Sequence, residues 1–207
     1  DLDSVIYKAT GGILLHDLRN DWIDNLYLLI GKAYYFRREF DSAALTFQFI
    51  NYNLFPRKKG EDDNRNVGSN VEEGKSALSI ADKEKRNLVQ KTLTQPPSRN
   101  DALIWLTRTF IEQEKFGDAA GMISILQGDP NLPKRLRNDL DEVTSYWFFK
   151  QKNYDSAAVY LERGISNADN KADKSRWQYL LGQMFERNGD YSKASDYYAK
   201  AAKHTND

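Results

Sequence analysis

The residues of this chain that could carry out chemistry are few and scattered. The sequence contains no cysteine, which removes disulfides, thiolate metal sites and cysteine nucleophiles. Its two histidines, His16 and His204, lie far apart, which argues against a histidine-rich metal site. No Ser/His/Asp set or pair of carboxylates stands out. We therefore expect a protein that is not an enzyme and that needs no metal or other cofactor.

Two charged stretches imitate ligand-binding motifs. The run from Gly68 to Ser76 ends in Gly-Lys-Ser like a phosphate-binding loop, but five residues precede its second glycine where that loop has four. The pair Glu72-Glu73 inside it would also repel a phosphate. The acidic run from Glu61 to Asn64 lacks the alternating spacing and distal glutamate of a calcium loop. We interpret both stretches as solvated charge.

Composition narrows the class of protein further. Lysine plus arginine equal aspartate plus glutamate, 30 against 30, so the chain lacks the positive field that non-specific nucleic-acid binding uses. No apolar run reaches the roughly 18–20 residues that span a bilayer. The sequence starts at Asp1 without a methionine, and we expect it to be a fragment of a longer chain.

One pattern of small and aromatic residues recurs four times along the chain. A small residue is followed by an aromatic residue three positions later and by a second aromatic residue six positions after the first. An alanine comes three positions after the second aromatic residue, and a bulky apolar residue comes four positions after the alanine. In chain order the four sets are Gly31, Tyr34, Phe40, Ala43 and Phe47; Thr107, Phe110, Phe116, Ala119 and Ile123; Ser145, Phe148, Tyr154, Ala157 and Leu161; and Gly182, Phe185, Tyr191, Ala194 and Tyr198.

These spacings predict a repeated pair of antiparallel helices. The small residue and the first aromatic share one face of a first helix. The second aromatic stands at the turn, where we expect it to fill the gap between the two helices. The alanine lies early in the second helix, where only a methyl group fits the close crossing. Trp22, Trp105, Trp147 and Trp177 fall in predicted helices, and packing is their expected role.

The repeats cover most of a single expected domain of residues 1–207. Clear repeats occupy about 22–55, 100–128, 134–167 and 171–204, and the small residues of the last three are 38 and 37 positions apart. The first interval is 76, which leaves room for a polar loop at 56–76 and an amphipathic helix at 77–94. Residues 2–18 suggest a helix left over from an earlier pair.

The pattern resembles the tetratricopeptide repeat, whose consensus runs Trp–Leu–Gly–Tyr–Ala–Phe–Ala–Pro. Ile30, Gly31, Tyr34, Ala43 and Phe47 match it best, whereas the second and third repeats have threonine and serine where glycine is usual. The resemblance implies an all-α solenoid of stacked antiparallel helical hairpins, here with one long polar loop. A bundle with accidental similarity is the alternative.

A second resemblance is more specific. Val67–Asn70, Ala77–Ile80, Pro96–Ala102, Pro133–Leu140 and Tyr146–Phe148 resemble the tetratricopeptide lipoproteins of the Bacteroidota type IX secretion and gliding-motility machinery, of the PorW/SprE type. That family implies a periplasmic protein, held at the outer membrane by a lipid anchor outside this fragment, that links the export translocon to ring-forming components. The sequence alone leaves a cytoplasmic location open.

The repeat resemblance also implies where partner proteins bind. The first helix of each hairpin lines a concave groove in this family, and exposed aromatics beside arginine are typical of interaction hot spots. The lysine and asparagines that clamp chaperone C-termini are missing at the matching positions. The expected groove residues are Leu28, Lys32, Tyr35, Phe36, Ile104, Arg108, Ile111, Glu142, Tyr146, Phe149, Tyr179, Gln183 and Arg187.

These observations favour a non-catalytic scaffold that binds secretion-machinery proteins, with no small-molecule substrate and no nucleic acid. The alternative is a recruitment domain attached to a catalytic or cell-wall-modifying module outside this fragment. RNA binding by helical repeats is a weaker alternative, because the chain is neutral.

Overall fold

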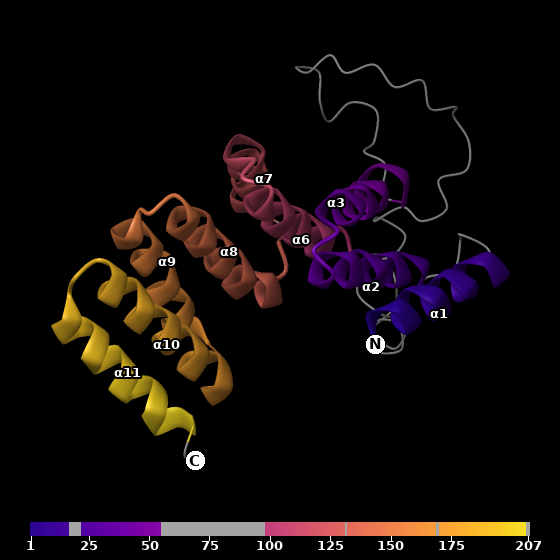
Figure 1. The fold of residues 1–207 in the computed structure, drawn as a ribbon. Coiled ribbons are helices and arrows are strands. Elements are labelled where there is room, and N and C mark those ends of the chain that lie inside the picture. The colour runs from indigo at the N-terminus through magenta and orange to yellow at the C-terminus, as the bar shows by residue number, and fades with distance from the viewer. Residues whose placement is uncertain (17–21, 55–97, 131, 169, 206–207) are drawn as a thin grey trace. The chain divides into compact units, whose positions relative to one another are not determined.

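All regular structure in the described part of the chain is helical. The computed structural model describes residues 1–16, 22–54, 98–130, 132–168 and 170–205, so the predicted loop at 56–76 and helix at 77–94 lie outside the described residues. The all-α expectation is confirmed for the part described. Its helices are α1 (Leu2–Leu15), α2 (Ile23–Phe36), α3 (Phe40–Phe49), η1 (Ile50–Leu54), α6 (Arg99–Glu112), α7 (Phe116–Gly128), η2 (Lys134–Leu136), α8 (Arg137–Lys150), α9 (Tyr154–Asn167), α10 (Lys171–Arg187) and α11 (Tyr191–Thr205) (Figure 1).

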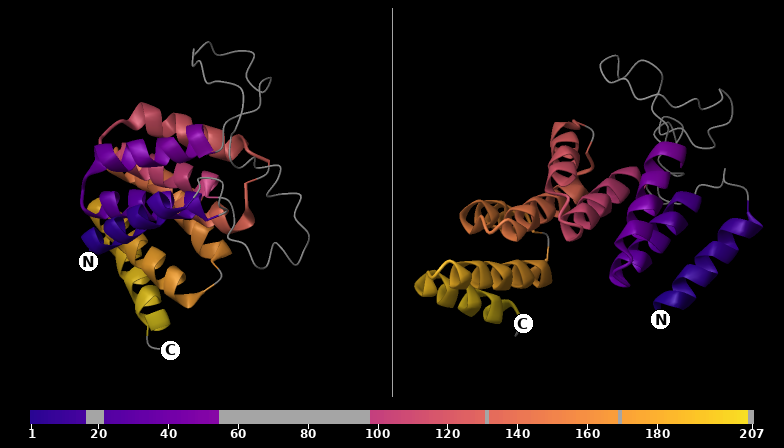
Figure 2. Two further views of the ribbon diagram at one scale, coloured as in Figure 1. Left: turned by 90° about the vertical axis from the view of Figure 1, so that its right-hand side faces the viewer. Right: turned by 45° about the horizontal axis from the view of Figure 1, so that its top comes forward.

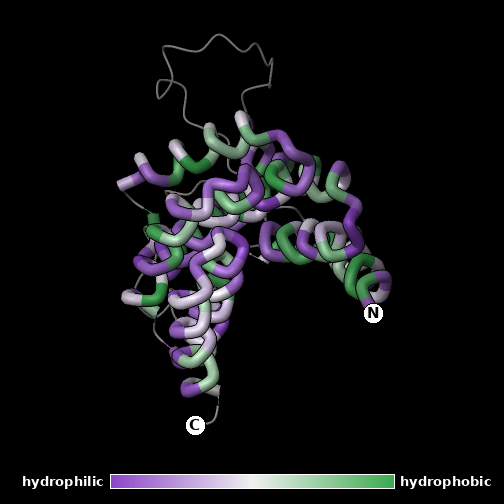
Figure 3. Tube along the Cα trace, turned by 60° about the vertical axis from the view of Figure 1, so that its left-hand side comes forward, coloured by the Kyte–Doolittle hydropathy of each residue, from purple (hydrophilic) through white to green (hydrophobic). Residues whose placement is uncertain are grey.

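The chain divides into two compact units. Unit 1 is Asp1–Thr109 and unit 2 is Phe110–Asp207, so the division falls within α6. In unit 1, α2 packs against both α1 and α3; in unit 2, α8 packs on α9 and α10 on α11 (Figure 2). Green and purple alternate along the helices in Figure 3, as amphipathic helices require. The expected single solenoid of residues 1–207 stays a prediction.

The same tight turn ends α2, α6, α8 and α10. In each turn one residue adopts the left-handed conformation: Arg38 at φ 63°, Glu114 at 59°, Lys152 at 62° and Gly189 at 82°. The next N–H then donates to the carbonyl five residues back, from Glu39 to Tyr34, Lys115 to Phe110, Asn153 to Phe148 and Asp190 to Phe185. This is the Schellman arrangement, which satisfies the last carbonyls of a helix and reverses the chain.

Small residues on one helix of a hairpin meet bulky residues on the other. A Cβ atom on Gly31 would lie 2.5 Å from the Phe47 ring, and one on Gly182 would lie 2.5 Å from the Tyr198 ring. Real Cβ contacts do not come so close, so glycine is required where the facing side chain is aromatic. The alanines of all four repeats, Ala43, Ala119, Ala157 and Ala194, are at most 3% exposed, as the close crossing requires.

The size of the facing residue explains why the third repeat departs from glycine. Ser145 stands at the position of Gly31 and Gly182, but the bulky residue sixteen positions later is Leu161, which is smaller than phenylalanine or tyrosine. Both Ser145 and Leu161 are buried, and the Ser145 hydroxyl donates to the Ala157 carbonyl at 2.8 Å. Serine therefore fills the space that an aromatic ring would occupy.

One turn aromatic does not fill a gap. Phe40, Phe116 and Tyr154 are half-buried, as expected, but Tyr191 is 71% exposed. The expectation was wrong for Tyr191 because α11 packs mainly on α10 among the described helices, and this contact leaves the Tyr191 ring in solvent.

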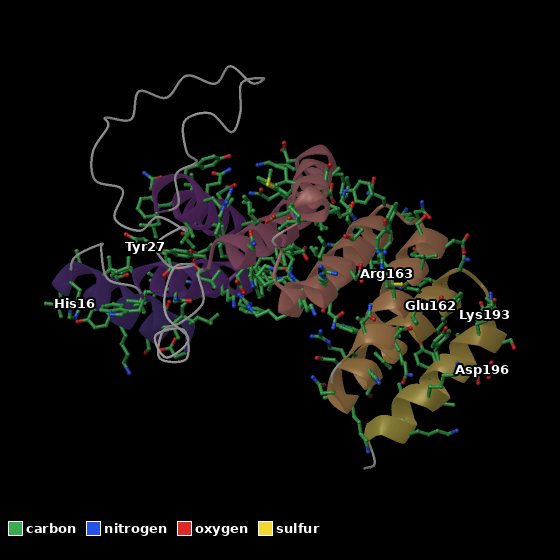
Figure 4. All side chains as sticks on the ribbon, turned by 180° about the vertical axis from the view of Figure 1, so that it is seen from behind. His16, Tyr27, Glu162, Arg163, Lys193 and Asp196 are labelled. Atoms are coloured by element: carbon green, nitrogen blue, oxygen red, sulfur yellow. The ribbon has the colours of Figure 1, made fainter. Side chains whose placement is uncertain are left out.

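Polar links join residues 33–35 positions apart within each unit. Arg37 pairs with Asp3 in unit 1, whereas in unit 2 Arg176 pairs with Glu142, Asn188 with Asp155 and Tyr197 with Glu162, over separations of 33–35 residues. Figure 4 labels Glu162 on α9, whose carboxylate accepts the Tyr197 hydroxyl of α11 at 2.6 Å. Burial, together with this carboxylate, raises the pKa of Tyr197 to about 12. These links recur at about one repeat length.

A buried carboxylate ties α2 to the start of α6. Asp24 is fully buried, and its Oδ2 atom accepts both the backbone N–H and the hydroxyl of Ser98 at 2.9 Å. Ser98 is the residue immediately before α6. Two donors to one buried oxygen satisfy a group that would otherwise be expensive to bury.

The size match within hairpins predicts a second-site rescue. Gly182→Ser should lower the free energy of unfolding by about 1–3 kcal/mol, because its side chain would collide with Tyr198. Adding Tyr198→Leu recreates the Ser145–Leu161 combination and should recover about 1 kcal/mol relative to the sum of the single changes. Urea denaturation of the three variants measures the coupling, and strictly additive losses would contradict the size match.

The left-handed turn residues predict opposite effects of glycine. Lys152→Gly should raise the free energy of unfolding by about 0.5–1 kcal/mol, because glycine adopts positive φ without steric penalty. Gly189→Ala should lower it by about 1 kcal/mol for the same reason. Gln151→Gly is the control, since Gln151 has φ −88° and gains nothing from glycine. Thermal unfolding measures the stability of all three variants. A destabilised Lys152→Gly variant would count against backbone strain at Lys152.

Candidate protein-interaction surface

In unit 1, Trp105 of α6 is surrounded by cations and aromatic rings. The Lys32 ammonium lies 5.1 Å and the Arg108 guanidinium 5.4 Å from the ring centroid. Tyr35 and Phe36 approach the indole edge-to-face, with centroids at 5.3 and 5.7 Å. We call Lys32, Tyr35, Phe36, Trp105 and Arg108 the Trp105 cluster.

Helical spacing on two helices assembles this cluster. Lys32, Tyr35 and Phe36 are three and four positions apart on α2 and therefore share a face. Trp105 and Arg108 share a face of α6 in the same way. Buried Phe47 of α3 stacks on Trp105, with ring centroids 6.5 Å apart. The tie between Asp24 and Ser98 fixes the start of α6 against α2.

The Trp105 cluster is suited to binding rather than to chemistry. It holds cations and aromatic rings but no acid, thiol or imidazole, and half-buried Trp105 and 61%-exposed Phe36 leave apolar surface in water. A cation over an indole contributes about 0.5–1 kcal/mol at an exposed site. Tryptophan, tyrosine and arginine are the side chains that dominate protein-interaction hot spots.

In unit 2, Glu112, Tyr146, Phe149, Lys150 and Arg187 form a second set, the Tyr146 cluster. The Glu112 carboxylate accepts the Tyr146 hydroxyl and pairs with the Lys150 ammonium at 3.1 Å. Lys150 also lies 5.4 Å from the Tyr146 ring centroid, and Tyr146 stacks on Phe149 at 6.5 Å. The Arg187 guanidinium lies 5.1 Å from the Phe149 ring. Like the first cluster, it combines aromatic rings with charge.

Both clusters use the same place in the repeat. Phe36, Glu112, Lys150 and Arg187 each end the helix before a Schellman turn, and their spacings of 76, 38 and 37 match those of the small residues. Glu112 and Lys150 were absent from the expected groove. The sequence signal for these two residues is that oppositely charged side chains, Glu112 and Lys150, occupy the same position in consecutive repeats.

Three of the expected groove residues belong to the core instead. Leu28 is 8%, Ile104 2% and Ile111 0% exposed. Their assignment to a binding surface is corrected. A first helix that packs against two neighbouring helices buries aliphatic side chains on more than one of its faces. The aromatic and cationic members Lys32, Tyr35, Phe36 and Arg108 come together, and so do Tyr146, Phe149 and Arg187.

The other expected residues have mainly structural contacts or stand outside the clusters. Glu142 accepts from the Arg176 guanidinium at 2.7 Å and from the Trp177 indole N–H at 3.2 Å. Tyr179 is 51% exposed and packs on Tyr198, with ring centroids 5.4 Å apart. Gln183 is half-buried.

The tryptophans were expected to pack within helices, and two differ from that expectation. Trp177 is 3% exposed and Trp147 donates to the Phe116 carbonyl at 2.9 Å, as packing residues do. Trp22 instead precedes α2 and meets the His16 ring edge-on at 4.9 Å. Trp105 packs, but it also forms the centre of the candidate surface, which its residue type alone did not indicate.

Among the residues described, no three His, Asp or Glu side chains gather as metal ligands would. None of the described helices has the length and apolar character needed to cross a bilayer. The phosphate-loop imitation at Gly68–Ser76 and the acidic run at Glu61–Asn64 lie outside the described residues.

The cation over Trp105 predicts a measurable coupling. Arg108→Met keeps the aliphatic stem but removes the charge, and it should lower the free energy of unfolding by about 0.5–1 kcal/mol. In a Trp105→Leu background the same change should have less effect, because the ring is gone. Equal effects in both backgrounds, measured by urea denaturation, would show that Arg108 acts through other contacts.

No protein-family model matches the sequence. No curated protein matches it either.

Proposed function

We propose that this chain is a tetratricopeptide-type scaffold that binds other proteins through the Trp105 and Tyr146 clusters. The observation that carries the proposal is the pairing of partly exposed aromatic rings with cations on the first helices of successive repeats. Such side chains combine apolar area, charge and low conformational entropy, and interfaces use them as anchors.

Several repeated features support the tetratricopeptide assignment. Four identical turns, four buried alanines and two glycine–aromatic contacts recur at the spacing of the sequence repeat. Polar links also tie α8 to α10 and α9 to α11 within unit 2.

The chemistry of the Trp105 cluster suggests the kind of segment that it binds. Lys32 and Arg108 both provide positive charge next to the Trp105 ring, and Phe36 extends the apolar area into solvent. An extended or helical peptide with an acidic residue next to an aliphatic one would complement both features. The partner is a protein, and neither a nucleic acid nor a small-molecule substrate is part of the proposal.

The proposed setting is the periplasmic side of the outer membrane in a type IX secretion or gliding-motility apparatus. This part rests on the sequence resemblance to the PorW/SprE-type lipoproteins. Two of the runs that carry it, Pro133–Leu140 and Tyr146–Phe148, lie in or directly before η2 and α8. The scaffold would link translocon and ring components, and the lipid anchor would lie outside this fragment.

The proposal predicts that a cluster variant loses its partner. The fragment serves as bait for solubilised envelope of a gliding Bacteroidota cell, and the captured protein is then purified and titrated by calorimetry. Phe36→Ala with Arg108→Ala should weaken binding at least about tenfold, roughly 1.4 kcal/mol. Leu45→Ala is the matched control, because Leu45 is a 68%-exposed apolar residue outside the cluster.

The polar stretch at residues 56–76, which the sequence predicts to be a loop, is the alternative binding region to the Trp105 cluster. A third variant replaces Glu61 to Gly74 by a short glycine–serine link, and the circular dichroism of all variants is compared first. Loss of the partner by this variant, with full retention by the Phe36/Arg108 variant, would falsify the assignment to the Trp105 cluster.

A further inference from the structure

The turn between α10 and α11 contains the one Asn-Gly step of the sequence, Asn188-Gly189. Both residues are exposed. Gly189 has a φ of 82°, and a Cβ atom at this position would meet nothing within 4 Å. The three equivalent turns have arginine or glutamine at the place of Asn188. This turn therefore differs from the other three in the reactions that its side chain and backbone allow.

An asparagine followed by glycine can react with its own backbone. The nitrogen of Gly189 forms a bond to Cγ of Asn188, the bond between Cγ and Nδ2 breaks, and Nδ2 leaves as ammonia with the proton that the backbone nitrogen gives up. Water then opens the cyclic imide and leaves aspartate or isoaspartate. Water is the only co-reactant. Glycine favours the attack because it has no side chain to shield the nitrogen, and asparagine is accordingly among the thermolabile residues of proteins.

Two hydrogen bonds must break before this attack. The Gly189 N–H donates to the Glu186 carbonyl at 3.1 Å, and Nδ2 of Asn188 donates to Oδ1 of Asp155 at 3.2 Å. The first bond is part of a helix end, and helix ends open at little cost in free energy. The second comes from the start of α9 and keeps the amide turned away from its own backbone. The contact with Asp155 therefore slows the reaction but does not prevent it.

We propose that Asn188 is a site of spontaneous deamidation and that its hydrogen bond to Asp155 controls the rate. The exposed turn provides the reactive step, and the neighbouring repeat provides the protection. The proposal uses no contact of the Trp105 or Tyr146 cluster, so it is independent of the proposed function.

Deamidation changes the link between α9 and α10 from attraction to repulsion. The product has a carboxylate where Asn188 donated, and this carboxylate faces that of Asp155. Isoaspartate also lengthens the backbone within the Schellman turn, where the Asp190 N–H donates to the Phe185 carbonyl. The end of α10 is therefore released from the start of α9. Because Asn188 directly follows Arg187, the new charge also lies beside a cation of the Tyr146 cluster.

The first measurement follows the reaction in the full chain. The chain is incubated at mildly alkaline pH, where the backbone nitrogen loses its proton more readily, and its proteolytic peptides are analysed by mass spectrometry and by enzymatic methylation of isoaspartate. Asn188 should be converted, whereas Asn153 should stay intact. Asn153 is the matched control because it is exposed in the equivalent turn of the preceding repeat but is followed by Tyr154.

The second measurement tests the role of Asp155. Asp155→Ala removes the acceptor and should speed the conversion of Asn188 about fivefold, the effect of losing one ordinary hydrogen bond that opposes local opening. Asp196→Ala is the control, because it removes an exposed carboxylate from α11 (Figure 4) without touching this turn. It should leave the rate unchanged. The circular dichroism of both variants is compared with that of the parent chain first.

The third measurement tests the consequence without the reaction. Asn188→Asp has the same side chain as the deamidated product and should raise the equilibrium constant of unfolding about fivefold. Adding Asp155→Asn returns an amide donor opposite the new carboxylate, with the two partners exchanged, and should restore most of the loss. Thermal and urea unfolding measure both variants.

Each part of the proposal has a result that would overturn it. Conversion of Asn188 no faster than that of Asn153 would remove the site. An unchanged rate in the Asp155→Ala variant would remove its control by Asp155. A double variant no more stable than Asn188→Asp alone would show that the two side chains are not coupled, and the release of α10 from α9 would then be wrong.

Discussion

The structure depends on how closely the two helices of a hairpin approach each other. An aromatic ring on one helix needs a glycine on the other, and the Cβ positions of Gly31 and Gly182 leave no room for any side chain. Buried alanines allow the same close approach one turn earlier in the second helix. In the third repeat the bulky residue is the smaller Leu161, and Ser145 stands at the glycine position. The Ser145 hydroxyl donates to the Ala157 carbonyl. Packing at crystal-like density makes such size pairs mutually dependent, so the hairpin is the unit in which residues are coupled.

This constraint decides which side chains remain available to partners. Most aliphatic residues of the first helices lie in the core, whereas Phe36, the last residue of α2, is 61% exposed. The two clusters leave part of their surface in water because aromatic rings can cover the edge of the core and still present one side to solvent. Cations over those rings keep the exposed surface soluble. A helix pair therefore provides a binding surface without irregular structure of its own.

Much of the fold could be predicted from residue types, and the reasons for success and failure are physical. The buried alanines were predictable because steric exclusion leaves few residue types at a close crossing. The left-handed turn residues were not, because Arg38, Glu114 and Lys152 are charged residues that do not signal positive φ. Leu28, Ile104 and Ile111 were misplaced because a period alone does not say which inward face is covered. Trp105 was overlooked as a surface residue because tryptophan packs by default, and buried Asp24 gave no signal at all.

The contact between Asp24 and Ser98 has a consequence for the order in which unit 1 folds. Hairpins close over short chain distances, and the polar links between repeats span 33–35 residues, but Asp24 and Ser98 are 74 positions apart. Doubling a loop adds only about 0.6 kcal/mol of closure entropy, so equilibrium stability is little affected. Folding rates depend more strongly on distant contacts, because the entropy of closing the loop is lost before the contact can stabilise the chain. Docking of α6 onto α2 would thus follow formation of the α2–α3 hairpin, and the carboxylate would be desolvated last.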